Sequence, residues 1–306
     1  MPLLLVIALV GCGGGSDSDD ASSAAKSRAA NSPEVKKLLR QTFGPNPNAT
    51  SGKLSGTVDL EVEGAPRYRE PVQVTLSGPF SQSGNSPAEA NLSVGLRLRG
   101  GAIGGELVLI DDRVLIGLGS SAYTIPPSIA APIRRPLSNT SNGLGSVMRV
   151  FGVDPRRWAK NPRIVGNEKV AGEDTIRGTA EIDTNRFFLD VARLARVLTS
   201  LRITEIVGLP REVDRADRVA LSRSVKRATG NVWTGAEDKV LRKATFDMLL
   251  EPSARDRRRL GFSSLSVKGE LNVTEVGEPQ EIESPRIAGT FDDLQATFDA
   301  LAESVK

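Results

Sequence analysis

The chain has 306 residues, of which 39% are hydrophobic and only 4% aromatic, and it contains no histidine. Without histidine, Ser-His-Asp and Cys-His catalysis, histidine metal ligands and histidine pH switches are excluded. Lysine and arginine number 40 against 37 aspartates and glutamates, a formal net charge of +3. So small a surplus, with so few aromatic side chains, argues against nucleic acid as a partner.

The amino terminus is predicted to be a signal peptide over residues 1–11. The apolar run of residues 3–10 is too short to span a bilayer, which takes about 20 apolar residues, but suits the apolar region of a signal peptide. The sequence Leu9-Val10-Gly11-Cys12 that ends it resembles the bacterial lipobox. In a lipobox the cysteine thiol receives a diacylglyceryl group, and the cysteine becomes the first residue of the mature chain. Met1 and Pro2 supply no positive charge, which departs from that pattern, and a start site placed too far downstream would explain it.

Residues 12–31 are rich in Gly, Ser, Ala and Asp, and are expected to form a disordered tether behind the lipidated Cys12. The alternative for Cys12, an ordinary buried thiol, would need apolar surroundings that this segment does not supply. As the only cysteine, it also leaves the protein without an internal disulfide. We expect residues 32–306 to form a single β-rich domain.

The domain begins with a predicted helix and continues as strands. Ser32-Pro33 suits a helix start, and apolar residues from Val35 to Phe43 follow at helical spacing. From Lys53 apolar and polar residues alternate, which is typical of strands with one buried face. The short turns between these runs, such as Asp111-Asp112, favour an antiparallel meander. The alternating runs are residues 54–62, 72–76, 92–99, 106–110, 113–118 and 121–125.

The second half is predicted to mix helices and strands. A Pro- and Ser-rich loop at 126–142 precedes a weak helix at 144–151. Two strands then flank Gly172, and a helix begins at Asp183 or Thr184 with apolar residues from Phe187 to Leu201 along one side. The later elements are a basic helix at 214–228, strands at 231–234, 240–250 and 262–276, and a helix at 290–304.

Several charged positions have an ordinary structural interpretation. The run Arg255–Arg259 is expected to be a solvated hairpin loop, with contact to anionic lipid headgroups as the alternative. Asp111-Asp112 and Asp292-Asp293 are interpreted as turn and helix-cap residues, not as a general acid and base. We therefore expect no catalytic residue, no metal site, no cofactor and no enzymatic activity.

Two stretches carry a resemblance to a known family: residues 167–183, and residues 232–244 followed by 271–279 and 282–285. Their order resembles the actinobacterial lipoproteins related to LppX and LprG, and more distantly the lipoprotein carrier LolA. The resemblance covers roughly residues 53–285. It implies an α+β fold in which a single strongly bent antiparallel β-sheet, a half-barrel, wraps around a few helices. The loop insert at 126–136 and the basic helix near 215–227 depart from the family.

The resemblance also implies an apolar cavity that holds acyl chains. The chain would then be a lipoprotein anchored through Cys12 on the outer face of the cell membrane, with a lipid or lipidated molecule as partner. The alternative is a structural or interaction lipoprotein with a filled core, acting on a cell-envelope partner that the sequence does not name. The predicted cavity residues are Val58, Leu60, Val94, Leu96, Leu107, Leu109, Phe187, Val191, Leu194 and Leu198.

The anchor makes a first prediction. Replacing the thiol in a Cys12→Ala variant removes the only group that could form the thioether, so the protein should move from the membrane fraction to the soluble fraction. Fractionation of cells followed by immunoblotting measures this. A variant as firmly membrane-bound as the parent would contradict the anchor.

Overall fold

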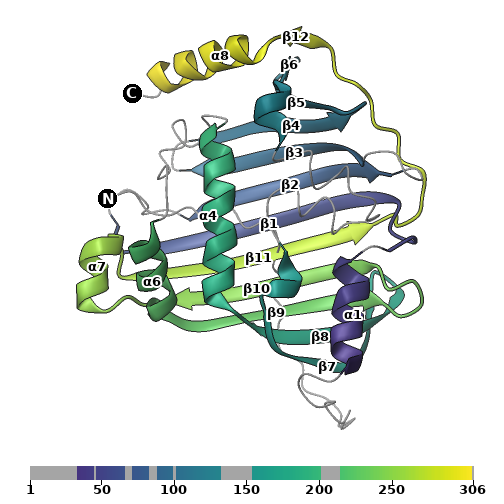
Figure 1. The fold of residues 1–306 in the computed structure, drawn as a ribbon, viewed down its shortest axis with the longest axis vertical. Helices are drawn as coiled ribbons and strands as arrows, with labels where there is room; N and C mark the ends of the chain where they lie inside the picture. Colours follow the sequence, from purple (N-terminus) through teal and green to yellow (C-terminus); the bar gives the residue numbers. More distant parts are fainter. Residues whose placement is uncertain are drawn as a thin grey trace.

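The computed structural model describes residues 33–44, 46–65, 71–82, 88–98, 101–131, 154–200 and 214–304. The expected signal peptide, the tether and the weak helix at 144–151 lie outside these residues. Twelve strands form one sheet in the order β12-β6-β5-β4-β3-β2-β1-β11-β10-β9-β8-β7 (Figure 1). The sheet is open and curled, and a few helices lie against one face. The predicted fold class, α+β with a single bent antiparallel sheet, is therefore confirmed.

Two meanders meet in the middle of this sheet. The first, from β1 to β6, and the second, from β7 to β11, are joined because β1 pairs with β11. All neighbours run antiparallel except β12, which pairs with β6 in parallel. The strands are β1 (Ser51–Glu63), β2 (Val72–Ser81), β3 (Glu89–Leu98), β4 (Gly101–Ile110), β5 (Arg113–Leu118), β6 (Ser121–Thr124), β7 (Ala159–Val170), β8 (Glu173–Ile182), β9 (Val225–Gly235), β10 (Leu241–Leu250), β11 (Ser264–Thr274) and β12 (Ile287–Gly289).

The helices cover one side of the sheet, here called the inner face (Figure 1). The alternation of β1 places Val58 and Leu60 on that face, where both are almost fully buried. Asp59, the residue between them, points outward and stays partly accessible to water. The helical elements are α1 (Pro33–Phe43), η1 (Pro155–Arg157), α4 (Thr184–Ser200), α6 (Arg215–Ser224), α7 (Ala254–Leu260) and α8 (Phe291–Ser304). Residues 127–131 also form a short helix, so the segment predicted as a loop at 126–142 begins with a helical turn.

The core of the described residues falls into two clusters. The first lies beneath α4 and α6, where Phe187 packs edge-to-face against Trp158, Phe188 and Phe246. Such ring pairs add to the burial of apolar area. The second lies beneath the end of α1 and beside α8, and includes Phe43 and Leu294. Burial on the inner face is thus divided between two groups of helices.

The structure corrects two predictions from the sequence. Arg255–Arg259 lies in helix α7 and not in a hairpin loop: the Ser253 side chain accepts a hydrogen bond from the Asp256 N–H at the helix start, and Gly261 ends the helix at φ 78°. The basic helix α6 ends at Ser224, short of the predicted Ala228, because Val225 pairs with Leu250 and begins β9. In both places a long charged run concealed the element boundary.

Local turn chemistry agrees with the sequence in other places. Asp111 and Asp112 form the β4–β5 turn with φ of 46° and 65°, and two strands flank Gly172 as predicted. At the start of α8, Asp293 Oδ2 accepts hydrogen bonds from the Thr290 N–H and hydroxyl at 2.7 and 2.8 Å. These bonds hold the pKa of Asp293 below its usual range. Asp293 is therefore a helix-cap residue, as expected.

A buried carboxylate ties η1 to α4. Asp190 is 1% exposed, and its Oδ2 accepts a hydrogen bond from the Trp158 indole N–H at 2.9 Å. The same carboxylate pairs with Arg193 one turn along α4. Because a buried charge is costly without such partners, this contact fixes η1 against the helix.

Removing this carboxylate should therefore destabilise the fold. An Asp190→Ala variant leaves the Trp158 N–H without its acceptor, and the free energy of unfolding should fall by about 2–3 kcal/mol. Urea denaturation measures this. As a control, Asp174→Ala removes an exposed partner of Lys169 and should change stability by less than about 0.5 kcal/mol. Equal effects of the two variants would contradict the structural role of Asp190.

Candidate functional site

An apolar pocket lies between α1 and the inner face of β7, β8, β9 and β10. Its empty volume is about 730 Å³, part of which is open to solvent. Three groups of residues enclose it: a floor from the sheet, a roof from α1, and a side wall from η1 and the start of β7. Most of the residues that line it are apolar, and the polar ones are Arg163, Thr179, Glu181, Asn231 and Thr245.

The floor is hollow because its side chains are small. Ala180 of β8 lies opposite Gly230 of β9, and Gly178 lies opposite Val232, which in turn pairs with Ala244 of β10. Neighbouring strands are only ~4.8 Å apart, so these positions are continuous across three strands. A Cβ atom on Gly230 would come no closer than 3.5 Å to another atom, so close packing does not require glycine there. The absence of a side chain at Gly230 leaves open space above the sheet.

The roof is the amphipathic helix α1. Val35, Leu38, Leu39 and Phe43 recur at three- and four-residue intervals and all line the pocket. The predicted first helix is therefore confirmed, and it lies across β7, β8 and β9 in Figure 1. Two helical turns of apolar side chains thus separate the pocket from water.

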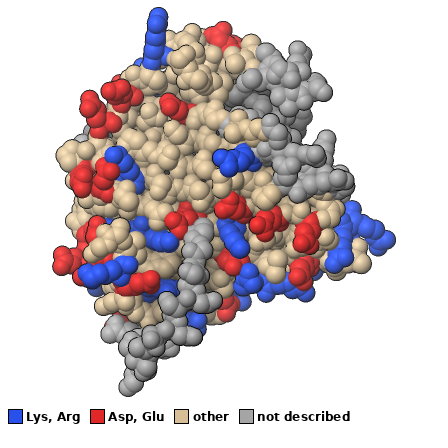
Figure 2. Space-filling view, turned by 180° about the vertical axis from the view of Figure 1, so that it is seen from behind, with Lys and Arg blue, Asp and Glu red and all other residues tan. Residues whose placement is uncertain are grey.

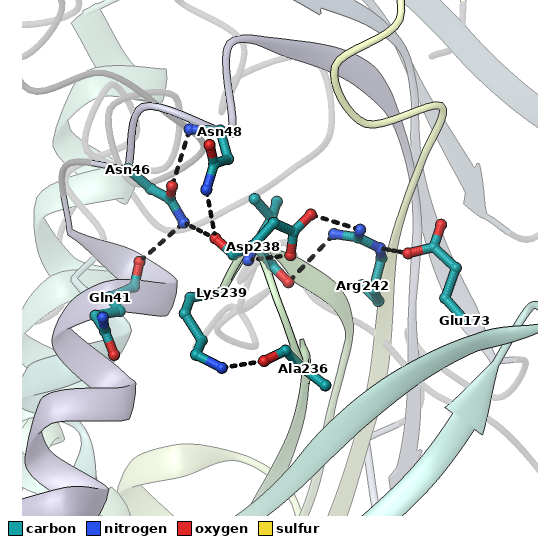
Figure 3. Close-up of polar contacts among 9 residues, drawn as sticks. Gln41, Asn46, Asn48, Glu173, Ala236, Asp238, Lys239 and Arg242 are labelled. Atoms are coloured by element: carbon teal, nitrogen blue, oxygen red, sulfur yellow. Dashed lines mark hydrogen bonds and ion pairs between the residues drawn. The ribbon is translucent and has the colours of Figure 1, made fainter.

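The carboxyl end of α1 is held to the β9–β10 turn by a network of polar contacts, here called the latch (Figure 3). The Thr42 hydroxyl lies 2.8 Å from the buried Thr234 hydroxyl of β9. Just beyond the helix, the Asn46 and Asn48 side-chain amides donate to the Asp238 carbonyl at 3.0 and 3.1 Å. The roof is therefore attached to the same strands that form the floor.

The turn that receives the latch is itself braced by a nearly buried arginine. Arg242 is 9% exposed and donates to Asp238 Oδ2 at 2.7 Å and to Glu173 Oε2 at 2.5 Å (Figure 3). Glu173 begins β8, so the pair of contacts spans from β10 to β8. Charge-assisted bonds of this kind fix the geometry of a turn more firmly than neutral ones.

The side wall comes from Pro155, Trp158 and the first residues of β7. Asp154 precedes this wall and forms a two-point contact with Arg156, at 2.8 and 2.9 Å. Burial alone would raise the pKa of Asp154, but the hydrogen bonds and charge of Arg156 outweigh it and lower the pKa. The ionised carboxylate therefore stabilises η1 beside the pocket.

The ten predicted cavity residues lie elsewhere on the inner face. Eight have described side chains, and none of them lines this pocket. They lie in or against the two packed clusters, and their role in binding lipid stays a prediction. Val58, Leu60, Leu96, Phe187 and Val191 belong to the first cluster, Leu109 belongs to the second, Val94 and Leu107 pack against the second, and the side chains of Leu194 and Leu198 lie outside the described residues.

Sequence reasoning missed the pocket floor although a signal for it was present. Small residues recur on the inner face of β8 and β9, at Gly178, Ala180 and Gly230. Their significance depends on a register that brings Ala180 beside Gly230, 50 residues later in the chain. Only the helix that forms the roof could be predicted from the sequence, because the apolar stripe of α1 depends on residues that are close together in the chain.

Neither a metal-binding cluster nor a membrane-spanning helix is found in the described residues. Within the described ranges, no group of three or more Cys, Asp or Glu side chains could hold a metal ion. No helix in that part of the chain is long and apolar enough to cross a membrane.

Comparison with known proteins gives matches at the level of the fold. No protein-family model matches the chain, and no curated protein matches it by sequence. Among solved structures, LprF from Mycobacterium bovis matches 84% of this chain and 99% of its own at 15% identity and a TM-score of 0.42. The lipoprotein LppX from Mycobacterium tuberculosis matches 83% of this chain and 100% of its own at 13% identity, with the same TM-score. A LolA superfamily protein from Nitrosomonas europaea matches 79% of this chain and 94% of its own at 10% identity and a TM-score of 0.23.

LppX is one of the lipoproteins that the sequence resemblance named, and the third match belongs to the superfamily of LolA. The solved structures that match this chain thus include lipoproteins of the kind that the sequence resemblance indicated.

The contact between Asp154 and Arg156 beside the side wall predicts that the stability of the fold depends on pH. Because the pKa of Asp154 is lowered in the folded state, its stabilising effect is present above the unfolded pKa of about 3.9 and is lost as pH falls through the folded value. Unfolding midpoints measured from pH 6 down to pH 3 should therefore fall more steeply for the wild type than for Asp154→Asn. Parallel curves for the two proteins would show that Asp154 does not support the wall.

Proposed function

We propose that this protein is an exported, membrane-anchored lipoprotein that binds an acyl chain of a lipid or lipidated molecule in the pocket beneath α1. The observation that carries this proposal is an apolar hollow floored by small residues and roofed by an amphipathic helix.

The chemistry of the pocket favours an acyl chain over a polar ligand. A hydroxyl or amide placed among Leu38, Val232 and Phe246 would lose its hydrogen bonds to water, at a cost of at least ~1 kcal/mol for each group. Each methylene transferred from water would instead contribute ~0.8 kcal/mol. Binding would thus depend on the amount of hydrocarbon buried.

The role that follows is to shield a lipid from water beside a membrane. The Cys12 anchor would hold the protein at the outer face of the cell membrane, where the domain would accept or deliver a lipid. This function requires no nucleophile, acid, base or cofactor. We accordingly propose a binding or transfer protein and not an enzyme.

A second candidate function is a structural or interaction lipoprotein acting on a cell-envelope partner. The observation in its favour is the dense packing of the early strands, where Val58, Leu60 and Leu96 are at most 9% exposed. In that case the pocket would be a packing defect without a ligand, and lipid should not bind there.

Filling the pocket tests the proposal. Ala180 lies on the inner face, so Ala180→Trp should occupy the floor and lower the affinity for a fluorescent fatty acid at least tenfold. Lys160 of the neighbouring strand β7 is exposed and does not line the pocket, so Lys160→Trp should stay within twofold of the wild type. Mass spectrometry of gently extracted protein should find co-purifying lipid in the wild type and in Lys160→Trp, but little in Ala180→Trp.

Two results would overturn the proposal. The first is the absence of co-purifying lipid across several extractions, together with no binding of the fatty acid. The second is equal binding by both tryptophan variants, which would place the lipid away from this pocket. Thermal melts of both variants show whether each has folded.

A further inference from the structure

The helix pair α6–α7 concentrates positive charge at one end of the molecule. Between them, residues 214–224 and 253–260 contain seven arginines, three aspartates and no lysine or glutamate. Their net charge of +4 exceeds the +3 of the entire chain. Figure 2 shows Lys and Arg side chains gathered at the edge of the molecule where these helices lie. The charge is therefore a local feature and not a general property of the surface.

The three aspartates of the pair are used to hold it together. Arg259 of α7 contacts Asp217 and Asp214 of α6 at 2.6 Å each. In the opposite direction, Arg223 of α6 reaches Asp256 of α7 at 2.7 Å. The hydrogen bond from the Asp217 N–H, followed by Arg259, holds the pKa of Asp214 low. Burial would raise the pKa of Asp256, but the hydrogen bonds from Arg223 and the Ser253 hydroxyl outweigh it and lower that pKa. The acids thus form ion pairs with arginines that lie between the two helices.

The outer side carries arginines that the fold does not need. On α7, Arg255 and Arg258 are exposed and point away from the buried Asp256 and Leu260. On α6, Arg215 is exposed and lies away from the buried Ala220 and Leu221. None of these three arginines takes part in an ion pair with another described residue.

An exposed apolar side chain lies beside one of these charges. Val219 follows Arg215 by one helical turn on the same side of α6 and is 44% exposed. It is one of three large apolar residues exposed in the described part of the chain. Apolar and cationic side chains exposed together on a helix are typical of surfaces that rest on membranes.

We propose that Arg215, Val219, Arg255 and Arg258 form a docking surface for a bilayer containing anionic phospholipid. Guanidinium groups match phosphate oxygens in a two-point geometry that an ammonium group cannot make. Val219 would enter the boundary between headgroups and acyl chains, which a nucleic acid or a soluble polyanion does not offer. This surface would act in addition to the Cys12 anchor: the anchor would hold the protein at the bilayer, and the surface would set the orientation of the domain on it.

Docking there would orient the pocket toward the membrane. Strand β9 runs from Val225, next to α6, to Gly230 on the pocket floor, about 17 Å along the strand. The latch on α1 lies at the far ends of β9 and β10, away from the bilayer. The pocket would thus lie within one lipid length of the surface.

Vesicle binding tests this surface. The full chain with Cys12→Ala, which removes the anchor, is mixed with phosphatidylcholine vesicles with or without phosphatidylglycerol. We expect binding only to the anionic vesicles, falling as salt rises. Adding Arg215→Gln, Arg255→Gln and Arg258→Gln should weaken it about a hundredfold, because each cation near an anionic surface contributes roughly fivefold.

A matched control removes the same charge elsewhere. Arg97→Gln, Lys268→Gln and Arg286→Gln replace three exposed cations away from α6 and α7, and should weaken binding less than threefold. Val219→Ser alone should weaken it severalfold without changing the salt dependence. Ala180→Trp should leave vesicle binding unchanged, so failure of this inference can be told apart from failure of the lipid pocket.

Three outcomes would overturn the inference. Equal losses of vesicle binding in the two triple variants would mean that binding depends only on the net charge of the protein. Equal binding to neutral and anionic vesicles would remove the role of the arginines. Binding of RNA or heparin as tight as vesicle binding, with no effect of Val219→Ser, would indicate a polyanion site.

Discussion

The pairing of β1 with β11 is the contact on which the rest of the structure depends. It joins residues more than 200 positions apart, with Leu60 opposite Val267 and Val58 opposite Gly269. Through it, two separate meanders become one sheet with one continuous inner face. Without it, β1 and β11 would each be an open edge with unpaired N–H and C=O groups, and the inner face would be divided in two. The helices can cover the sheet only because this face is continuous.

That continuity also explains where the pocket lies. A single row of inward residues crosses the sheet at one level, with branched side chains at one end, glycine and alanine at the other, and Gly269 and Phe246 between them. At the β3 end the row is filled by branched side chains, and at the β8 end glycine and alanine leave it empty. In order across the sheet, the row is Leu96, Val74, Val58, Gly269, Phe246, Gly230 and Ala180.

Much of the fold could be predicted from local pattern. The alternation of β1 and the stripe of α1 each identify an element, and the family resemblance supplied the bent sheet. Predicted cavity residues such as Val58 and Leu96 share a row with the pocket floor but lie outside the pocket, and their role in binding lipid stays a prediction. Strand alternation shows which side of a strand is buried, but not which strands are neighbours. The β8–β9 register that makes the floor is a long-range property. The helix at Arg255–Arg259 was missed because its caps, Ser253 and Gly261, lie outside the charged run.

The central claim is that the hollow between α1 and the β8–β10 floor holds an acyl chain. A crystal structure with a fatty acid brominated near its methyl end tests it most directly, because the bromine can be located by anomalous scattering. We expect the bromine between Leu38 of α1 and the floor at Ala180 and Gly230. A bromine located outside this pocket, or no bound fatty acid at saturating concentration, would contradict the claim.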